Sequence, residues 1–297
     1  MDDPAKEQQE PNGSQKNKRS LRRYDPDQVM GIRAGARLSA AAHSRFVQFH
    51  CSAPEFAGQA VWCYNIGVTE KISPGRPPMK PLVLFDMDGT LLDSVPTIAL
   101  CCNRALAENG LPQHPIPKYN SMVGWGMRRL ITLACPEGSG EQTLAKVMAA
   151  YDRIYTEECC QKGILYPGVE QLLRRLRQKG VLTAVITNKP QRQADALYRS
   201  TFSGLLDAVW GQREGMPLKP DPTLARALIE SLEGRAAAYV GDSPVDIALG
   251  AHLGLPTILM TWGSKTAEEL RAADPNAVLA DTAEELERLL ETHLSAG

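Results

Sequence analysis

Two acidic residues stand two positions apart at the end of an apolar run. Residues 82–85 read Leu-Val-Leu-Phe, and Asp86 and Asp88 follow at once in "LVLFDMDGT". Burying an unpaired carboxylate costs several kcal/mol, so a purely structural strand is expected to end in Gly, Asn or Ser. The two acids therefore indicate chemistry at the end of this strand.

Other polar residues follow apolar runs in the same way. Thr187 and Asn188 end one run, Gly241 and Asp242 end another, and Lys219 lies in the loop "GMPLKPDP". In an open α/β sheet the ligand site lies beyond the carboxyl ends of the strands, so we expect these side chains at one rim. Acids clustered with a lysine are unfavourable unless a cation binds, and carboxylates select hard ions such as Mg²⁺. Such an ion among polar donors suits a phosphoryl group.

Apolar runs and amphipathic segments alternate from residue 81 onward, which is typical of an α/β fold with a doubly wound parallel sheet covered on both faces. The pattern predicts strands at 81–86, 181–188, 206–211, 236–242 and 256–262, and helices at 169–180, 190–199, 222–232, 244–254 and 282–294.

One insertion interrupts this alternation. Residues 97–165 show helical patterns at 97–110, 126–135 and 143–160 without a clear strand. They predict a small helical cap on two hinges, near 93–96 and 166–168. The expected domains are a core of residues 80–96 and 166–297, the cap of residues 97–165, and an N-terminal extension of residues 1–79.

The extension differs in composition from the rest of the chain. Residues 2–28 are polar and charged, and no sustained apolar period follows up to residue 80. Because Met79 directly precedes the first strand, we expect the functional domain to begin there and residues 1–78 to be dispensable. The competing interpretation is that the apolar stretch 47–68 packs on the core or cap. The basic cluster "KNKRSLRR" is interpreted as a solvated tail, and nucleic acid is not favoured as a partner.

Whole-chain features restrict the class of protein. The formal net charge is −1 over 297 residues, no apolar run reaches the length of a membrane span, and residues 1–30 contain no block of the secretory type. Seven cysteines without a CxxC spacing suggest reduced thiols. These features predict a cytoplasmic protein without a membrane partner, and leave the oligomeric state open.

Four motifs in order resemble the haloacid dehalogenase (HAD) superfamily over residues 80–297. "FDMDGTLLDS" looks like its motif I, "ITNK" like motif II, Lys219 in "KPDP" like motif III and "GDSPVDI" like motif IV. "NRALAENGLP" and "MVGWGMRRLI" are similar to the cap of the phosphoglycolate phosphatase-like subgroup. The resemblance implies a Rossmann-like core with an inserted all-helical cap.

The resemblance also implies roles for motif I. Asp86 would be the nucleophile that forms an aspartyl-phosphate, and Asp88 would be the general acid and base. Gly89 would let the chain turn at the phosphate site, and Thr90 could hydrogen-bond beside the nucleophile. Dehalogenases of the superfamily lack the second acid, so Asp88 favours phosphoryl transfer.

The other motifs would supply the phosphate and metal contacts. Thr187, Asn188 and Lys219 would hold the phosphate. Asp86, the backbone carbonyl of Asp88, and Asp242 would bind Mg²⁺, and Asp246 would support the site from one helical turn further on. Taken singly, these residues have plainer interpretations: Asp242 or Asp246 as a helix N-cap, Thr187–Asn188 as a turn, and Lys219 as a surface lysine.

A substrate loop in the cap is the least specific prediction. It would comprise Gly124, Trp125, Gly126, Arg128 and Arg129, with an arginine meeting a substrate carboxylate. The alternative is a helix with exposed arginines and a packed Leu/Ile face.

The predicted function is hydrolysis of a small phosphorylated metabolite, with 2-phosphoglycolate as the leading substrate. A phosphosugar mutase of the β-phosphoglucomutase kind, a pyrophosphate or nucleotide phosphatase, and a catalytically inactive binding protein on the same fold remain as alternatives.

Overall fold

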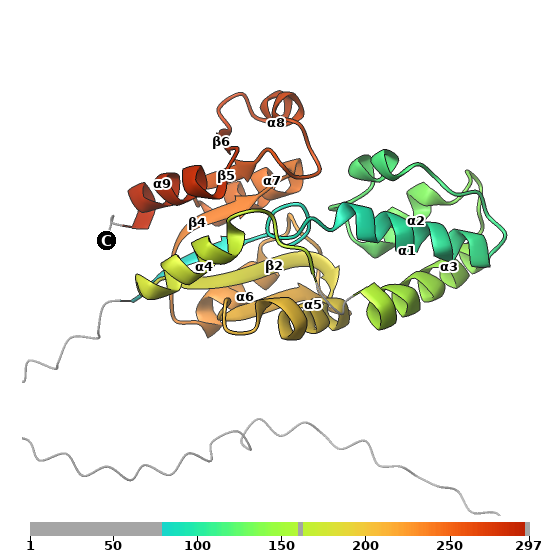
Figure 1. Ribbon diagram of the computed structural model, residues 1–297, viewed down its shortest axis with the longest axis horizontal. Coiled ribbons are helices and arrows are strands. Elements are labelled where there is room, and N and C mark those ends of the chain that lie inside the picture. Colours follow the sequence, from blue (N-terminus) through green and yellow to red (C-terminus); the bar gives the residue numbers. More distant parts are fainter. Residues whose placement is uncertain (1–78, 160–162, 295–297) are drawn as a thin grey trace, which may run out of the picture. The chain divides into compact units, whose positions relative to one another are not determined.

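The computed structural model describes residues 79–159 and 163–294 (Figure 1). The predictions for the N-terminal extension, including the basic cluster and the packing of residues 47–68, lie outside the described residues.

Six parallel strands form the central sheet (Figure 1), in the order β3-β2-β1-β4-β5-β6. Their bounds are Pro81–Phe85 (β1), Leu182–Pro190 (β2), Ala208–Gln212 (β3), Arg235–Gly241 (β4), Thr257–Met260 (β5) and Val278–Ala280 (β6). Five of them match the predicted strands. β1 lies inside the sheet, paired on one side with β2 and on the other with β4. The residues that follow β1 and β4 are therefore brought side by side.

Helices cover both faces of the sheet, as the doubly wound pattern predicts. Those of the core are Val169–Gln178 (α4), Gln191–Leu197 (α5), Thr223–Ser231 (α6), Pro244–Leu253 (α7), Ala267–Ala273 (α8) and Ala283–Leu294 (α9). Apolar side chains of α4 and α9 pack with Val83 and Phe85, whereas those of α6 and α7 pack with Leu82 and Leu84. Alternate residues of β1 thus reach the two faces, and both are buried.

Between β1 and α4 the described chain is helical. The elements are Val95–Glu108 (α1), a 3₁₀ turn Ile116–Ser121, Met127–Ala134 (α2), Glu141–Ile154 (α3) and a π-helical turn Tyr155–Cys159. Tyr119, Ile131 and Val147 are fully buried among these helices. The predicted all-helical insert is confirmed; its first helix begins at Val95, two residues earlier than expected.

Two elements of the core were not predicted. The helix α8 and the strand β6 form between β5 and α9, and β6 pairs with β5 through Ile258–Met260. With only three residues, β6 is too short to show an apolar period.

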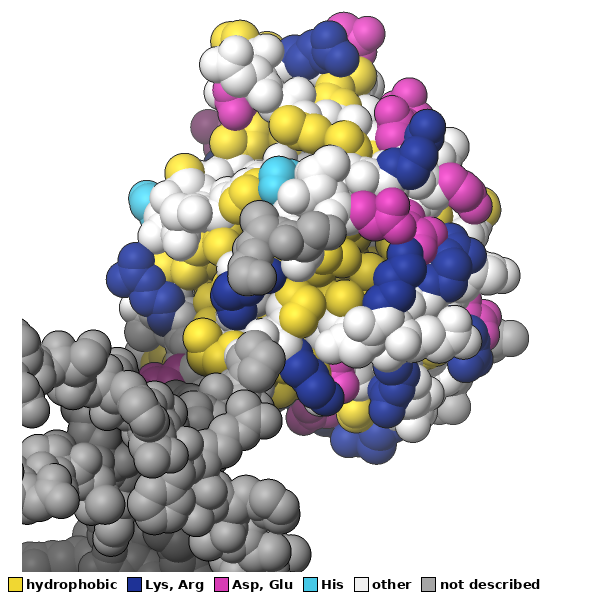
Figure 2. All heavy atoms as spheres, turned by 90° about the vertical axis from the view of Figure 1, so that its left-hand side faces the viewer, with side chains coloured by type: hydrophobic (Ala, Val, Ile, Leu, Met, Phe, Trp, Pro, Cys, Tyr) yellow, Lys and Arg dark blue, Asp and Glu magenta, His cyan; other side chains and the backbone are white. Residues whose placement is uncertain are grey.

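The expectation of reduced cysteines is wrong at one position. Cys101 is disulfide-bonded, whereas the buried Cys102 and Cys135 are free thiols. Within the described ranges, no helix has both the length and the apolar character needed to cross a membrane. On the face drawn in Figure 2, Lys and Arg side chains are interspersed with Asp and Glu rather than gathered in one basic area.

Candidate active site

Lys219 is the centre of a buried ionic network. Its Nζ lies 2.9 Å from Asp86 Oδ1 and 2.9 Å from Asp246 Oδ1, and it donates to the Tyr239 hydroxyl at 3.1 Å. Burial opposes the charge, but Asp246 and Asp86 raise the pKa of Lys219 above its ordinary value. The sequence placed Lys219 in a loop; the structure brings that loop against the end of β1, so the lysine neutralises the first acid of motif I.

Three buried aspartates meet beside this lysine. Asp86, Asp242 and Asp246 offer oxygens that lie within 4.8 Å of one another. Burial raises the pKa of Asp86 to about 8 against the opposing charge of Lys219. Burial, and then the charge of Asp246, raise the pKa of Asp242 to about 6. Two carboxylates that resist ionisation in a buried cluster fit a site for a divalent cation, which would favour their charged forms.

Asp246 stands apart within this cluster because its oxygens are already engaged. Oδ2 accepts the Ser243 hydroxyl at 2.6 Å and the Ser243 backbone N–H at 3.1 Å, and Oδ1 accepts from Lys219 and Tyr239. Burial works against its charge, yet Lys219 and Ser243 hold the pKa of Asp246 below its ordinary value. The geometry agrees with a supporting position that fixes Lys219 rather than with a direct ligand.

Gly89 and Thr90 both face Asp242. Thr90 Oγ1 donates to Asp242 Oδ1 at 3.1 Å, whereas we expected it to hydrogen-bond beside Asp86. Asp242 Oδ2 accepts from both the backbone N–H and the hydroxyl of Ser264, each at 2.7 Å. Gly89 has φ +83°, and a Cβ there would lie 2.3 Å from Asp242 Oδ2. Asp242 therefore leaves no room for a side chain at position 89.

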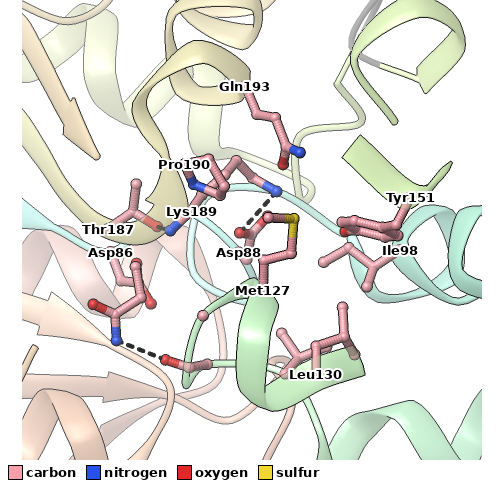
Figure 3. Close-up of a pocket in the computed structure, with 14 residues that line it drawn as sticks. Asp86, Asp88, Ile98, Met127, Leu130, Tyr151, Thr187, Lys189, Pro190 and Gln193 are labelled. Carbon is pink, nitrogen blue, oxygen red and sulfur yellow. Dashed lines mark hydrogen bonds and ion pairs between the residues drawn. The ribbon is translucent and has the colours of Figure 1, made fainter. Parts of the chain in front are cut away.

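Asp88 is paired with a lysine that the sequence analysis did not single out. Figure 3 shows Asp88 and Lys189 pointing toward each other, and Lys189 Nζ lies 3.1 Å from Asp88 Oδ2. The other oxygen, Oδ1, is buried and has no hydrogen-bond partner. A buried carboxylate oxygen without a hydrogen-bond partner costs folding free energy. Because it lies in the wall of a cavity, this oxygen is free to exchange a proton with a bound molecule.

Thr187 and Asn188 lie in β2, which continues two residues beyond the predicted end at residue 188. The Thr187 hydroxyl accepts the Lys189 backbone N–H at 3.2 Å. Asn188 Nδ2 donates to the carbonyls of Gly124 at 3.0 Å and Lys219 at 3.2 Å, and Oδ1 accepts the Lys219 backbone N–H at 2.8 Å. Both N–H groups of the Asn188 side chain and one lone pair of its oxygen are therefore engaged. The side chain joins two loops, so a contact from residue 188 to phosphate would come from its backbone.

A cavity of about 40 Å³ opens above these residues. One side of the cavity is lined by residues of the predicted motifs and by Lys189: Asp86, Asp88, Thr187, Asn188 and Lys189. The other side is lined by residues of the helical insert: Ile98, Val123, Gly124, Gly126, Met127, Leu130 and Tyr151. The second set is largely apolar, as Figure 3 shows for Ile98, Leu130 and Tyr151. Lys189 is the one cationic residue among those that line this cavity in the described structure.

The predicted cap loop is only partly at the cavity. Gly124 and Gly126 line it, but Arg128 pairs at 2.8 Å with Glu141 on the outside of the insert, with side chains 64% and 76% exposed. The Arg129 guanidinium lies over the Trp125 ring, 5.1 Å from its centroid. Helix α2 buries Leu130, Ile131 and Ala134, which turns Arg128 away. The alternative that we considered from the sequence, a helix with exposed arginines and a packed Leu/Ile face, therefore describes α2. Neither Arg128 nor Arg129 lines the cavity.

Several residues of the site were not anticipated from the sequence. Lys189 follows Thr187 and Asn188 directly, so its place at a strand end was a usable signal. Tyr155, whose hydroxyl accepts from Lys189 at 3.0 Å, and Ser264, which donates to Asp242, carried no such signal. Each lies far from its partner in sequence and reaches it only through packing.

The comparisons with known proteins agree with this geometry. Residues 83–260 match the sequence profile of the haloacid dehalogenase-like hydrolases. A phosphoglycolate phosphatase of Haemophilus influenzae is 33% identical over 213 residues, which cover 68% of this chain and 95% of the relative. A phosphoglycolate phosphatase of Rhodospirillum rubrum is 35% identical over 197 residues, covering 62% and 81%. The crystal structure of a predicted phosphoglycolate phosphatase from Haemophilus somnus superposes with a TM-score of 0.62 at 26% identity, covering 72% of this chain and 100% of the other.

Proposed function

The chain belongs to the haloacid dehalogenase-like hydrolase family, and we propose that it is a Mg²⁺-dependent phosphatase acting on a small phosphomonoester, with 2-phosphoglycolate as the substrate. The observation that carries this proposal is the arrangement of the two motif I acids in the wall of the cavity. There, Asp86 is held by Lys219 while Asp88 keeps an oxygen without a partner. The relatives named phosphoglycolate phosphatase support the choice of substrate.

The reaction has two half-reactions on the two motif I acids. A carboxylate oxygen of Asp86 attacks phosphorus, the ester bond breaks, and the leaving oxygen takes a proton from Asp88. Water then attacks the phosphorus of the aspartyl-phosphate and gives its proton to Asp88. The acyl phosphate bond breaks, which releases inorganic phosphate and restores Asp86. Lys219 remains beside Asp86 and offsets the negative charge of the phosphoryl group.

The donor set fits a hard divalent ion. Asp86, Asp242 and the backbone carbonyl of Asp88 would hold Mg²⁺, and Asp246 would keep Lys219 in place. When bound, the ion would supply positive charge that lowers the pKa of Asp86 and neutralises the phosphoryl oxygens.

The cavity favours a small leaving group. Its 40 Å³ correspond to roughly three water-sized volumes. Asn188 ties the cap loop to the core through the Gly124 carbonyl at 3.0 Å, and Lys265 donates to the Asn120 carbonyl at 3.0 Å. A two-carbon acid fits this space better than a sugar phosphate.

A cytoplasmic location stays a prediction, and the disulfide at Cys101 counts against the cysteine argument for it.

The test is a panel of phosphate esters with release of inorganic phosphate as the readout. We expect the highest kcat/KM on 2-phosphoglycolate, one phosphate released per ester consumed, and loss of activity with EDTA that Mg²⁺ restores. Asp86→Asn should abolish turnover and the acid-stable phosphoenzyme, because an amide is neither a nucleophile nor a good Mg²⁺ ligand. Activity that survives both EDTA and Asp86→Asn would refute the proposal, and isomerisation without phosphate release would show a mutase instead.

A further inference from the structure

Among the residues that the structure describes, the ammonium of Lys189 contacts Asp88 and Tyr155. Nζ lies 3.1 Å from Asp88 Oδ2, donates to the Tyr155 hydroxyl at 3.0 Å, and stands 4.2 Å from the centroid of the Tyr155 ring. The Lys189 side chain is 3% exposed. Because the group is almost fully removed from water, these contacts fix its position more firmly than a surface ion pair could.

The pairing makes the two oxygens of Asp88 unequal. Oδ2 is held by Lys189, whereas Oδ1 is buried without a partner in the wall of the cavity. A carboxyl group anchored through one oxygen has its plane and its second oxygen restricted as well. The anchored oxygen is the one that does not need to meet the substrate.

Tyr155 connects this arrangement to the helical insert. It begins the π-helical turn that continues α3, and its ring lies 5.6 Å from that of Tyr151, which lines the cavity. Lys189 belongs to β2 of the core. The contact therefore joins the core strand that bears motif II to the insert that lines the other side of the cavity.

We propose that Lys189 is a positioning residue that orients Asp88 toward the oxygen of the leaving group, and that Tyr155 holds Lys189 in this position. The inference rests on the proposed function, since it concerns the proton that Asp88 delivers. Lys189 acts through Asp88 and not by contact with the leaving group. Direct recognition of an anionic leaving group by Lys189 is the competing role, and the choice of substrates separates the two.

Three small substrates, two phosphate esters and one acyl phosphate, distinguish these roles. 2-Phosphoglycolate has a poor leaving group with a negative charge, 2-hydroxyethyl phosphate has a poor leaving group without one, and acetyl phosphate releases acetate, which needs no proton. The quantity compared is kcat/KM, because it covers the steps up to departure of the leaving group and excludes hydrolysis of the phosphoenzyme.

Lys189→Met removes the charge and keeps the length of the side chain. We expect kcat/KM to fall by about 10- to 100-fold on both poor leaving groups, a part of the 10²- to 10⁴-fold that general acid–base catalysis provides, and by less than about threefold on acetyl phosphate. Tyr155→Phe keeps the ring beneath the ammonium and removes the hydroxyl, so it should show the same pattern with a smaller loss. Lys265→Met is the matched control: its ammonium also donates to the insert, at Asn120, and we expect no dependence on the leaving group.

A second measurement asks whether Lys189 acts through Asp88. In an Asp88→Asn background, Lys189→Met should cost less than about twofold more, because the group that it positions no longer donates a proton. The inference would be overturned if Lys189→Met lowered kcat/KM by the same factor in the Asp88→Asn background as in wild type, or if it lowered kcat/KM equally on all three substrates. A loss confined to 2-phosphoglycolate would assign direct recognition instead. If Lys189→Met does not fold, Tyr155→Phe with the same three substrates decides.

These outcomes are distinct from failure of the proposed function. A wild-type chain that hydrolyses none of the esters would overturn the proposed phosphatase and this inference together. Normal wild-type hydrolysis with no leaving-group dependence in either variant would overturn the inference alone.

Discussion

Replacing Lys219 by methionine should destabilise the metal-free protein strongly. Lys219 Nζ is 2.9 Å from both Asp86 and Asp246, and all three side chains are buried. Removing one partner of a buried ion pair costs about 3–5 kcal/mol, since an uncompensated charge stays behind. At pH 7 without a metal ion, Asp86 with its pKa of about 8 is mostly protonated, so one carboxylate, that of Asp246, loses its partner. We therefore expect a loss of about 3–5 kcal/mol in the free energy of unfolding.

The pH dependence of this loss has a definite sign. The folded-state pKa of Asp86 is raised above its unfolded value of 3.8, so its protonated form stabilises the fold, and that contribution disappears as the pH rises toward 8. In the variant, the missing ammonium raises this pKa further. The deficit relative to wild type should therefore grow from pH 7 to pH 9, where wild-type Asp86 ionises beside Lys219. It should shrink toward pH 5, because Asp246 of the variant lacks the ammonium that holds its pKa down and can take up a proton at higher pH than in wild type.

Urea unfolding in EDTA at pH 5, 7 and 9 measures the deficit. Lys179→Met is the matched control, because Lys179 also bridges two acids, Glu287 at 3.0 Å and Glu291 at 2.7 Å, but is 44% exposed. Its loss should stay below about 1 kcal/mol at all three pH values. Equal losses for the two variants, or a Lys219 deficit that shrinks as the pH rises, would refute this account of the buried network.

Three further changes test other parts of the structure. Asp88→Asn should lower kcat on an alkyl phosphate by about 10²- to 10⁴-fold while Mg²⁺ still binds; near-normal turnover would remove the acid–base assignment. Gly89→Ala should raise the Mg²⁺ concentration needed for activity, since its Cβ would lie 2.3 Å from Asp242. Gly110→Ala, also at positive φ but with no atom within 4 Å, should cost about 1–2 kcal/mol of stability and leave the Mg²⁺ requirement unchanged. A chain that begins at Met79 should keep its melting temperature and activity, because β1 has strands on both sides and needs no added neighbour; a fall of several degrees would show that the extension packs on the domain.

The strands and the motif acids could be predicted from the sequence because both depend on neighbouring residues. A continuous apolar run predicts a strand buried on both faces, and the residue after that run must stand at the end of the strand. Asp86 and Asp242 were found in this way, and the order β2-β1-β4 then brings both to one place. The same local pattern was insufficient for β6, whose three residues show no period.

The pairing of side chains could not be predicted in this way, because it depends on which segments pack together. Lys189 meets Tyr155, 34 residues earlier in the chain, only because the π-helical turn after α3 lies against β2. The Asn188 side chain bonds the loops of Gly124 and Lys219, which the sequence did not predict, and its contact with phosphate stays a prediction. Arg128 was a candidate for the substrate, but burial of the apolar face of α2 turns it outward. Sequence alone thus determined which residues can do chemistry, and tertiary packing determined which of them reach the cavity, because side-chain direction is fixed by contacts between segments far apart in the chain.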